Sequence, residues 1–125
     1  MILGLGIDLI GVARIAGVYS RHGQRFLDRT YTTAEIAYCL ATRDPAERLA
    51  ARWAVKEAAM KALGTGWAQG VTFTQIALPP GGGLRPVLEL TGQAALVAAS
   101  LGANRWHASV SHSDGTAVAV VVLES

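Results

Sequence analysis

Apolar residues gather in short runs that predict strands at both ends of the chain. Residues 2–10 are almost all apolar, include β-branched side chains and stop at Gly11, which is typical of a buried strand. Near the other end, residues 106–111 and 116–123 predict two more strands. Because Ser-Asp-Gly at 113–115 is a hairpin turn signal, these two strands should pair.

A second hairpin is predicted in the middle of the chain. Residues 79–83 read Pro-Pro-Gly-Gly-Gly, which indicates a turn, and predicted strands at 71–78 and 84–90 flank it. The alanine-rich segment 91–101 that follows predicts a short helix ending at Gly102.

The first half of the chain carries the signals of three helices. Residues 13–22 predict the first, and a capping-box pattern at 32–35, Thr-Thr-Ala-Glu, predicts a second that runs to about residue 42. Asp-Pro-Ala-Glu at 44–47 is a stronger start signal for a long helix that runs to Leu63. This order of elements predicts a single α+β domain, in which a mainly antiparallel sheet packs with a long central helix.

The composition is apolar for a chain of 125 residues, with 51% hydrophobic and only 16% charged residues. Because a small domain has a large surface, part of this apolar surface is expected to close a subunit interface. Cys39 is the single cysteine, which excludes an intrachain disulfide and a cysteine zinc site. No apolar stretch is long enough to span a bilayer, and residues 1–10 lack a basic leader, so a cytoplasmic protein is expected.

The net charge of +2 is too small to argue for a nucleic-acid partner, and none is predicted. The pI near 9.0 and the excess of arginine over lysine fit a partner that bears phosphate or acidic groups. The same arginine bias is also expected from genome composition alone.

The only two lysines of the chain, Lys56 and Lys61, stand on either side of Glu57 in the long predicted helix. The segment around them is nearly all alanine and large apolar residues, where a charge is costly to bury unless it is paired or binds something. Lys61 lies one turn beyond Glu57, at the spacing of a Glu–Lys pair, while Lys56 projects from the apolar face. An ordinary surface pair together with a snorkelling Lys56 is the alternative interpretation.

Gly4 and Gly6 share the strand face of Asp8, since side chains alternate along a strand. This face is bare beside the carboxylate, so another group can approach the backbone closely. If Glu57 is buried near Asp8, the two carboxylates need a cation. Mg²⁺ suits them because it keeps several waters and often binds phosphate oxygens.

Two further motifs carry less specific signals. Ser111 and His112 point to opposite faces of a strand, which argues against a Ser–His nucleophile pair. His112 could bind an anion, act as an acid or base, or donate to a carbonyl. Residues 64–66, Gly-Thr-Gly, are either a helix C-cap or a place where backbone amides meet a ligand.

These motifs resemble those of the holo-acyl-carrier-protein synthases, the short bacterial type of 4′-phosphopantetheinyl transferase. The resemblance rests on Gly-Ile-Asp at 6–8, Trp-x-x-Lys-Glu-Ala-x-x-Lys at 53–61, Gly-Thr-Gly at 64–66 and Ser-Val-Ser-His at 109–112. The motifs occur in the family's order and cover essentially the whole chain. The resemblance implies the 4′-phosphopantetheinyl transferase fold. It also implies transfer of phosphopantetheine from coenzyme A to a serine of apo-acyl carrier protein, with release of adenosine 3′,5′-bisphosphate.

The resemblance also implies roles for single residues. Asp8 and Glu57 are similar to the Mg²⁺ ligands, and Lys61 to the lysine beside the transferring phosphate, which makes these three the catalytic set. Contacts with coenzyme A are implied for Lys56, Lys61, Gly64, Thr65, Gly66 and His112. Docking of the acidic carrier protein is implied for Arg14, Arg21, Arg25 and Phe26.

The family is trimeric, so the resemblance implies a homotrimer with active sites at subunit interfaces. It leaves open whether the carrier protein serves fatty acid or polyketide synthesis. Without the resemblance, the same residues fit a magnesium-dependent phosphohydrolase, which would release phosphate without a carrier protein. They also fit a non-enzymatic module, whose binding of coenzyme A or a nucleotide would survive loss of magnesium.

Overall fold

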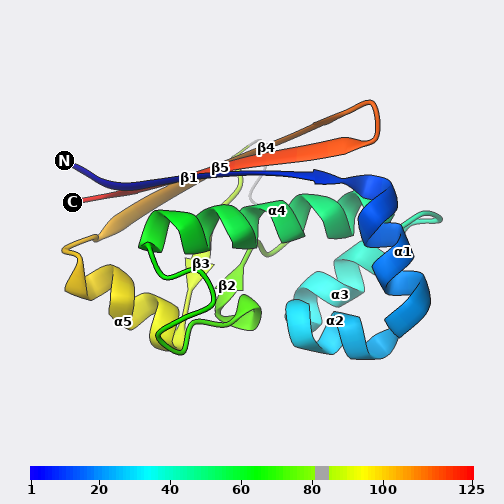
Figure 1. The fold of residues 1–125 in the computed structure, drawn as a ribbon, viewed down its shortest axis with the longest axis horizontal. Coiled ribbons are helices and arrows are strands. Elements are labelled where there is room, and N and C mark those ends of the chain that lie inside the picture. The colour runs from blue at the N-terminus through cyan, green and yellow to red at the C-terminus, as the bar shows by residue number, and fades with distance from the viewer. Residues whose placement is uncertain (81–84) are drawn as a thin grey trace.

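The first and last strands of the chain lie side by side in one antiparallel sheet. A computed structural model describes residues 1–80 and 85–125, and its three-stranded sheet has the order β1 (Ile2–Gly11), β5 (Thr116–Glu124), β4 (Arg105–Ser113). The predicted hairpin between the last two strands is confirmed. Because β1 pairs with β5, the two chain ends meet, and the Met1 amino group lies 3.2 Å from the Ser125 carbonyl oxygen (Figure 1).

The long helix α4 (Ala46–Leu63) runs along the inner face of this sheet (Figure 1). On its other side lie β2 (Ile76–Ala77), β3 (Glu89–Leu90) and α5 (Gly92–Ser100) (Figure 1). The helix is therefore covered on both sides, which explains its lack of a charged solvent face. No helix within residues 1–80 and 85–125 is long and apolar enough to cross a membrane.

Three short helices, α1 (Val12–His22), α2 (Gln24–Thr30) and α3 (Thr33–Leu40), gather at the amino-terminal end of α4 (Figure 1). The predicted capping box of α3 is confirmed, since Thr32 and Glu35 each accept a hydrogen bond from the other's backbone N–H. The sequence did not predict α2. It follows directly after Gly23, whose positive φ of 53° separates it from α1.

The second predicted hairpin is much shorter than expected. Its two strands, predicted at 71–78 and 84–90, are reduced to β2 and β3, and a 3₁₀ turn, Phe73–Gln75, occupies the middle of the first. This turn is closed by local bonds, since the Thr72 N–H donates to Gln75 Oε1 at 3.3 Å and the Gln75 N–H donates to the Thr72 carbonyl oxygen at 3.2 Å. The predicted turn at 79–83 and the start of the second strand fall largely on residues 81–84, outside the described residues.

Candidate functional site

Two glycines allow β1 to lie directly on α4. A Cβ atom at Gly6 would stand 1.8 Å from the Ala58 carbonyl oxygen, and one at Gly4 would stand 2.2 Å from that of Ala62. Neither distance is sterically possible, so only glycine permits this approach. The close approach predicted from the sequence is confirmed, and the group that makes it is the backbone of α4. Asp8, next on the same face, is thereby brought to the edge of α4.

At this edge Lys61 ties the helix to the strand. Its Nζ donates to the Ile7 carbonyl oxygen at 2.8 Å and to Asp8 Oδ1 at 3.3 Å. Among the described residues, Lys61 forms an ion pair with Asp8. The helical spacing in the sequence had instead predicted a pair with Glu57. Lys61 keeps 53% of its side chain exposed, so its ammonium also faces solvent.

The two carboxylates carry more negative charge than their surroundings neutralise. Asp8 Oδ2 is buried and has no hydrogen-bond partner among the described residues. Partial burial, followed by the charge of Asp8, raises the pKa of Glu57, while Lys61 opposes that rise. Two carboxylates therefore share one partly exposed ammonium, an arrangement that favours binding of a further cation.

The donor set determines which cation fits. Within residues 1–80 and 85–125, no group of three or more His, Cys, Asp and Glu side chains could hold a metal ion. A cation between Asp8 and Glu57 would thus take most of its ligands from water or from a bound substrate. Mg²⁺ has this coordination habit, so the residues present fit it.

Lys56 lies elsewhere, although it precedes Glu57 directly. Its side chain is 1% exposed and its ammonium donates to Glu35 Oε1 at 2.8 Å, to the Phe73 carbonyl oxygen at 3.0 Å and to that of Ile76. Burial lowers the pKa of Lys56 and the Glu35 carboxylate opposes this shift. Since all three ammonium protons have acceptors, none remains for a ligand. Lys56 is therefore a core residue in the single chain, and its contact with coenzyme A stays a prediction.

Residues 64–66 close the carboxyl end of α4. Gly64 adopts a left-handed conformation with φ 75°, and the N–H groups of all three residues donate to carbonyl oxygens of Met60 or Lys61. The helix-cap interpretation is thus the one that the structure supports. These amides are engaged in the helix cap, and the contact of residues 64–66 with coenzyme A stays a prediction.

His112 stands at the opposite end of the long helix from this cap. Its Nδ1 lies 4.0 Å from Oε1 of Glu47, in the first turn of α4. Glu47 precedes Glu57 by ten residues, which is about 15 Å along a helix axis. The structure does not bring His112 to the Asp8–Glu57 pair of the same chain.

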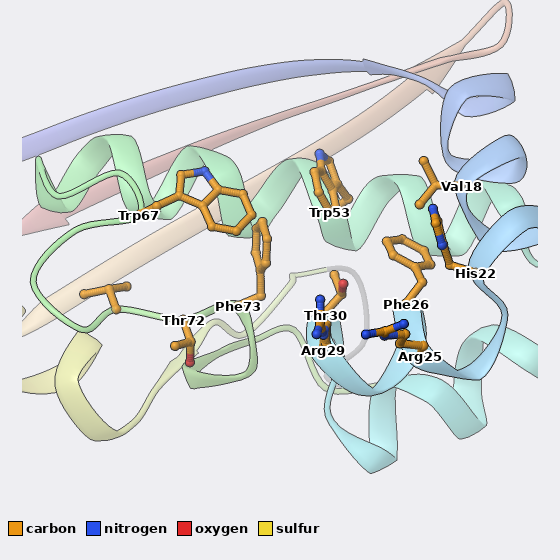
Figure 2. A pocket seen from close by; sticks show the side chains of 11 residues that line it. Val18, His22, Arg25, Phe26, Arg29, Thr30, Trp53, Trp67, Thr72 and Phe73 are labelled. Carbon is orange, nitrogen blue, oxygen red and sulfur yellow. The ribbon is translucent and has the colours of Figure 1, made fainter.

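A pocket of about 670 Å³ opens beside Trp53, one helical turn before Glu57 (Figure 2). Its aromatic wall is a continuous row in which the ring centroids of Trp53 and Phe73 lie 4.7 Å apart and those of Phe73 and Trp67 lie 4.5 Å apart. Its other wall, from α1 and α2, carries the basic side chains of His22, Arg25 and Arg29.

Two of the four predicted docking residues, Arg25 and Phe26, line this pocket, while Arg14 and Arg21 are exposed on α1. The sequence prediction missed the aromatic wall. Trp53 was visible on the apolar helix face, but Trp67 and Phe73 come from a loop without periodicity. Their contact with Trp53 depends on the return of this loop to α4, which no local sequence pattern indicates.

The outer face of the sheet is apolar and uncovered in the single chain. Leu5, Ile7 and Leu9 of β1 are 65%, 61% and 68% exposed. The register sets them beside the partly exposed Val122, Val120 and Val118 of β5. An apolar strip of this kind is typical of a surface that another chain covers.

Comparison with known proteins gives a consistent match over the whole chain. Residues 4–121 match the family model described as the 4′-phosphopantetheinyl transferase superfamily. The holo-acyl-carrier-protein synthase of Koribacter versatilis is 53% identical, over 99% of both chains. That of Solidesulfovibrio magneticus is 50% identical, again over 99% of both.

Solved structures of the same name share the fold. The synthase of Neisseria meningitidis superposes with a TM-score of 0.90 at 31% identity and full coverage of both chains. The Helicobacter pylori synthase in complex with coenzyme A gives 0.83 at 31% identity, covering 96% of this chain and 99% of that one. The Bacillus anthracis synthase, in complex with coenzyme A (3′,5′-ADP), gives 0.82 at 34% identity, covering 100% and 98%.

Proposed function

The chain belongs to the 4′-phosphopantetheinyl transferase superfamily, as one of its holo-acyl-carrier-protein synthases, and we propose how this transferase works. It moves 4′-phosphopantetheine from coenzyme A to a serine hydroxyl of apo-acyl carrier protein and releases adenosine 3′,5′-bisphosphate. The names of the relatives and the coenzyme A complexes of two similar structures support the substrates. The observation that carries the mechanism is the Asp8–Glu57 pair with its incompletely neutralised charge.

We propose Mg²⁺ as the cofactor and Asp8 and Glu57 as its ligands. The unpartnered Oδ2 of Asp8 and the raised pKa of Glu57 support this assignment, because both are relieved by a cation. When bound, the ion polarises the pyrophosphate of coenzyme A and neutralises charge on the leaving group.

The chain's own residues position the reaction and balance its charge. The serine oxygen bonds to the β-phosphorus, the bond to the bridging oxygen breaks, and the bisphosphate leaves with the electron pair. Lys61, held against β1 by the Ile7 carbonyl, places a fixed positive charge where negative charge develops. The serine proton needs an acceptor during this step, and the Glu57 carboxylate is a candidate for it.

We further propose that the active enzyme is a homotrimer formed through the outer sheet face. The exposed side chains of Leu5, Ile7 and Leu9 support a subunit contact there. In one chain His112 lies far along α4 from the carboxylates, so its contact with coenzyme A requires the site of a neighbouring subunit. Multi-angle light scattering of the wild type and of Ile7→Asp tests this: a trimer that falls to a folded monomer is expected.

The acidic carrier protein docks on α1, α2 and the adjoining pocket. Arg14 and Arg21 are exposed on α1, and Arg25 and Phe26 of α2 line the pocket. A basic surface of this kind speeds and orients the approach of an acidic partner.

Intact-mass spectrometry of apo-acyl carrier protein tests the proposal directly. After incubation with the protein, coenzyme A and Mg²⁺, the carrier protein should gain the mass of one phosphopantetheine. The gain should be lost with EDTA and with the Glu57→Gln variant. No mass change with several carrier proteins, despite a folded protein that binds coenzyme A, would refute the transfer. Release of phosphate without any carrier protein would instead support a hydrolase.

A further inference from the structure

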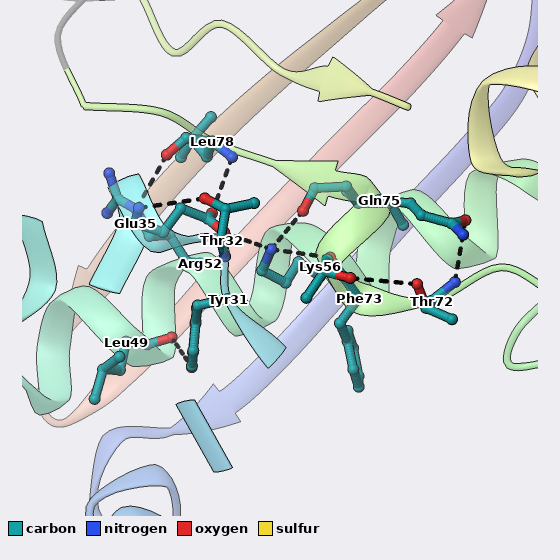
Figure 3. A network of polar contacts seen from close by, with 12 residues as sticks. Tyr31, Thr32, Glu35, Leu49, Arg52, Lys56, Thr72, Phe73, Gln75 and Leu78 are labelled. Atoms are coloured by element: carbon teal, nitrogen blue, oxygen red, sulfur yellow. Dashed lines mark hydrogen bonds and ion pairs between the residues drawn. The ribbon is translucent and has the colours of Figure 1, made fainter. Parts of the chain in front are cut away.

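The segment from Phe73 to Leu78 is held to α4 and α3 by buried polar side chains (Figure 3). Lys56 binds the carbonyl oxygens of Phe73 and Ile76. At the end of the segment, Glu35 Oε2 accepts from the Leu78 N–H at 3.0 Å and Arg52 Nε donates to the Leu78 carbonyl at 3.1 Å. Each end of the segment is therefore fixed through its backbone.

The segment has few other backbone hydrogen bonds of its own that could hold it in place. It pairs with β3 over only two residues, Ile76 and Ala77. A ladder this short is marginal by itself. Gln75 also accepts hydrogen bonds from the backbone N–H groups of Thr91 and Ala94, which tie the middle of the segment to the start of α5. On the side of α3 and α4, the polar bonds that hold the segment come from Lys56, Glu35 and Arg52.

The same segment forms the aromatic wall of the pocket. The carbonyl of Phe73 is bound to the buried ammonium, while its ring packs between Trp53 and Trp67 at centroid distances of 4.7 and 4.5 Å. Figure 2 shows this ring projecting to the pocket between the two tryptophans. One residue therefore connects the buried ion pair to the surface beside Glu57.

A buried ion pair gives little net stability, because desolvation of both groups offsets their attraction. Apolar side chains of similar volume would hold α3 and α4 together as well. They would not bind the two carbonyl oxygens of the segment, and these bonds define where Phe73 sits. Placement is thus the property that needs charged groups at positions 35 and 56.

We propose that Lys56 and Glu35 are positioning residues for the carrier protein: they fix Phe73 so that the pocket beside Trp53 is formed before the carrier arrives. The occupant we infer is an apolar side chain of the acidic carrier protein, because aromatic rings line one wall and basic side chains the other. The inference rests on the proposed transferase function.

The test removes both buried charges together, so that neither is left unpaired. In Lys56→Met/Glu35→Gln, the KM for the carrier protein should rise about tenfold while kcat and the KM for coenzyme A change less than about threefold. The near-ultraviolet circular dichroism of the Trp53–Phe73–Trp67 row should weaken. The matched control is Tyr31→Phe, which removes a buried hydrogen bond from the hydroxyl to the Leu49 carbonyl on another part of α4. It should lower stability and leave both KM values unchanged.

A double-mutant cycle shows whether the pair acts through Phe73. Phe73→Leu alone should raise the carrier KM, and adding it to Lys56→Met/Glu35→Gln should raise the KM further by much less than its separate effect. Additive effects, an unchanged carrier KM or an equal effect in Tyr31→Phe would each overturn the proposal.

Binding of apo-carrier protein to each variant, measured by calorimetry without coenzyme A, separates this inference from the transferase function. Weaker binding in the double variant supports the positioning role even if no transfer occurs. Equal binding to the double variant and the wild type refutes it even if transfer is confirmed.

Discussion

Lys56 and Lys61 lie five residues apart on one helix, but the first is buried and the second is exposed. Lys56 is 1% exposed, and Glu35 and two carbonyl oxygens accept its three protons. Lys61 is 53% exposed and partners one oxygen of Asp8, leaving the second oxygen and Glu57 incompletely neutralised. Complete hydrogen bonding marks a structural ion pair, and incomplete pairing of charge marks a place that can bind a ligand.

The strongest test of this contrast is Glu57→Gln. Removing one of the two carboxylates should reduce transfer by about a thousandfold or more, because both cation binding and charge balance are lost. The fold should remain intact, since Glu57 holds no core element in place. Activity is measured by intact mass of the carrier protein and folding by circular dichroism. Retention of most activity in the folded variant would reject the ligand assignment.

Removing the charge of Lys56, the buried lysine, should affect the stability of the fold first. Lys56→Met alone leaves Glu35 buried without its cation and should lower the free energy of unfolding by about 3–5 kcal/mol. Adding Glu35→Gln should restore much of that loss. Urea denaturation of the two variants measures both values. If the single variant is as stable as the wild type, the buried pair does not matter to the fold.

Lys61→Met should have the reverse effect, a large loss of kcat with little loss of stability. Loss of the positive charge beside the transferring phosphate should lower kcat about ten- to a hundredfold. The free energy of unfolding should change by less than about 1 kcal/mol, because more than half of the side chain is in solvent. A large loss of stability with unchanged kcat would make Lys61 a structural residue like Lys56.

Each of the proposed docking arginines should have a smaller effect on transfer than Glu57 or Lys61. Arg14→Ala or Arg21→Ala should raise the KM for the carrier protein several-fold, and more than the KM for coenzyme A. Because both side chains are exposed, the effect should shrink as salt is added. Steady-state kinetics at two ionic strengths measure it. Equal changes in both KM values would reject the docking role of α1.

The smallest expected effect concerns stability and pH without divalent ions. The pKa of Glu57 is raised in the folded state, so its contribution to stability is greatest at low pH and is lost as pH rises through that pKa. Glu57→Gln should therefore melt slightly above the wild type at neutral pH, and the difference should vanish below about pH 4. Added Mg²⁺ should raise the melting temperature of the wild type only. A variant that melts below the wild type at neutral pH would contradict the shift.

Most of the fold followed from local signals in the sequence. The strand at 2–10, the last hairpin and the capping box at 32–35 each depend on residues close in the chain, and all three are confirmed. The second hairpin was wrong in extent, because a 3₁₀ turn at Phe73–Gln75 stands where a strand was predicted. The α2 helix escaped prediction because its seven residues are too few to show a period.

The candidate site was predictable in part for a similar reason. Gly4, Gly6 and Asp8 share a face by simple alternation, so their approach to α4 could be inferred. The two lysines look equivalent in the sequence. Which one enters the core depends on Glu35 and on carbonyl groups about twenty residues away in the chain, and no local pattern carries that information.

The geometry of the site depends on Gly4 and Gly6, two residues that a search for reactive groups would overlook. They contribute no functional group, yet a methyl group at either position would collide with the backbone of α4 and lift β1, with Asp8, away from Glu57. The distance between the backbones that carry the two carboxylates is thus set by main-chain contact between β1 and α4. For an evolving or engineered enzyme, these two positions should tolerate the least change, although they take no part in the chemistry.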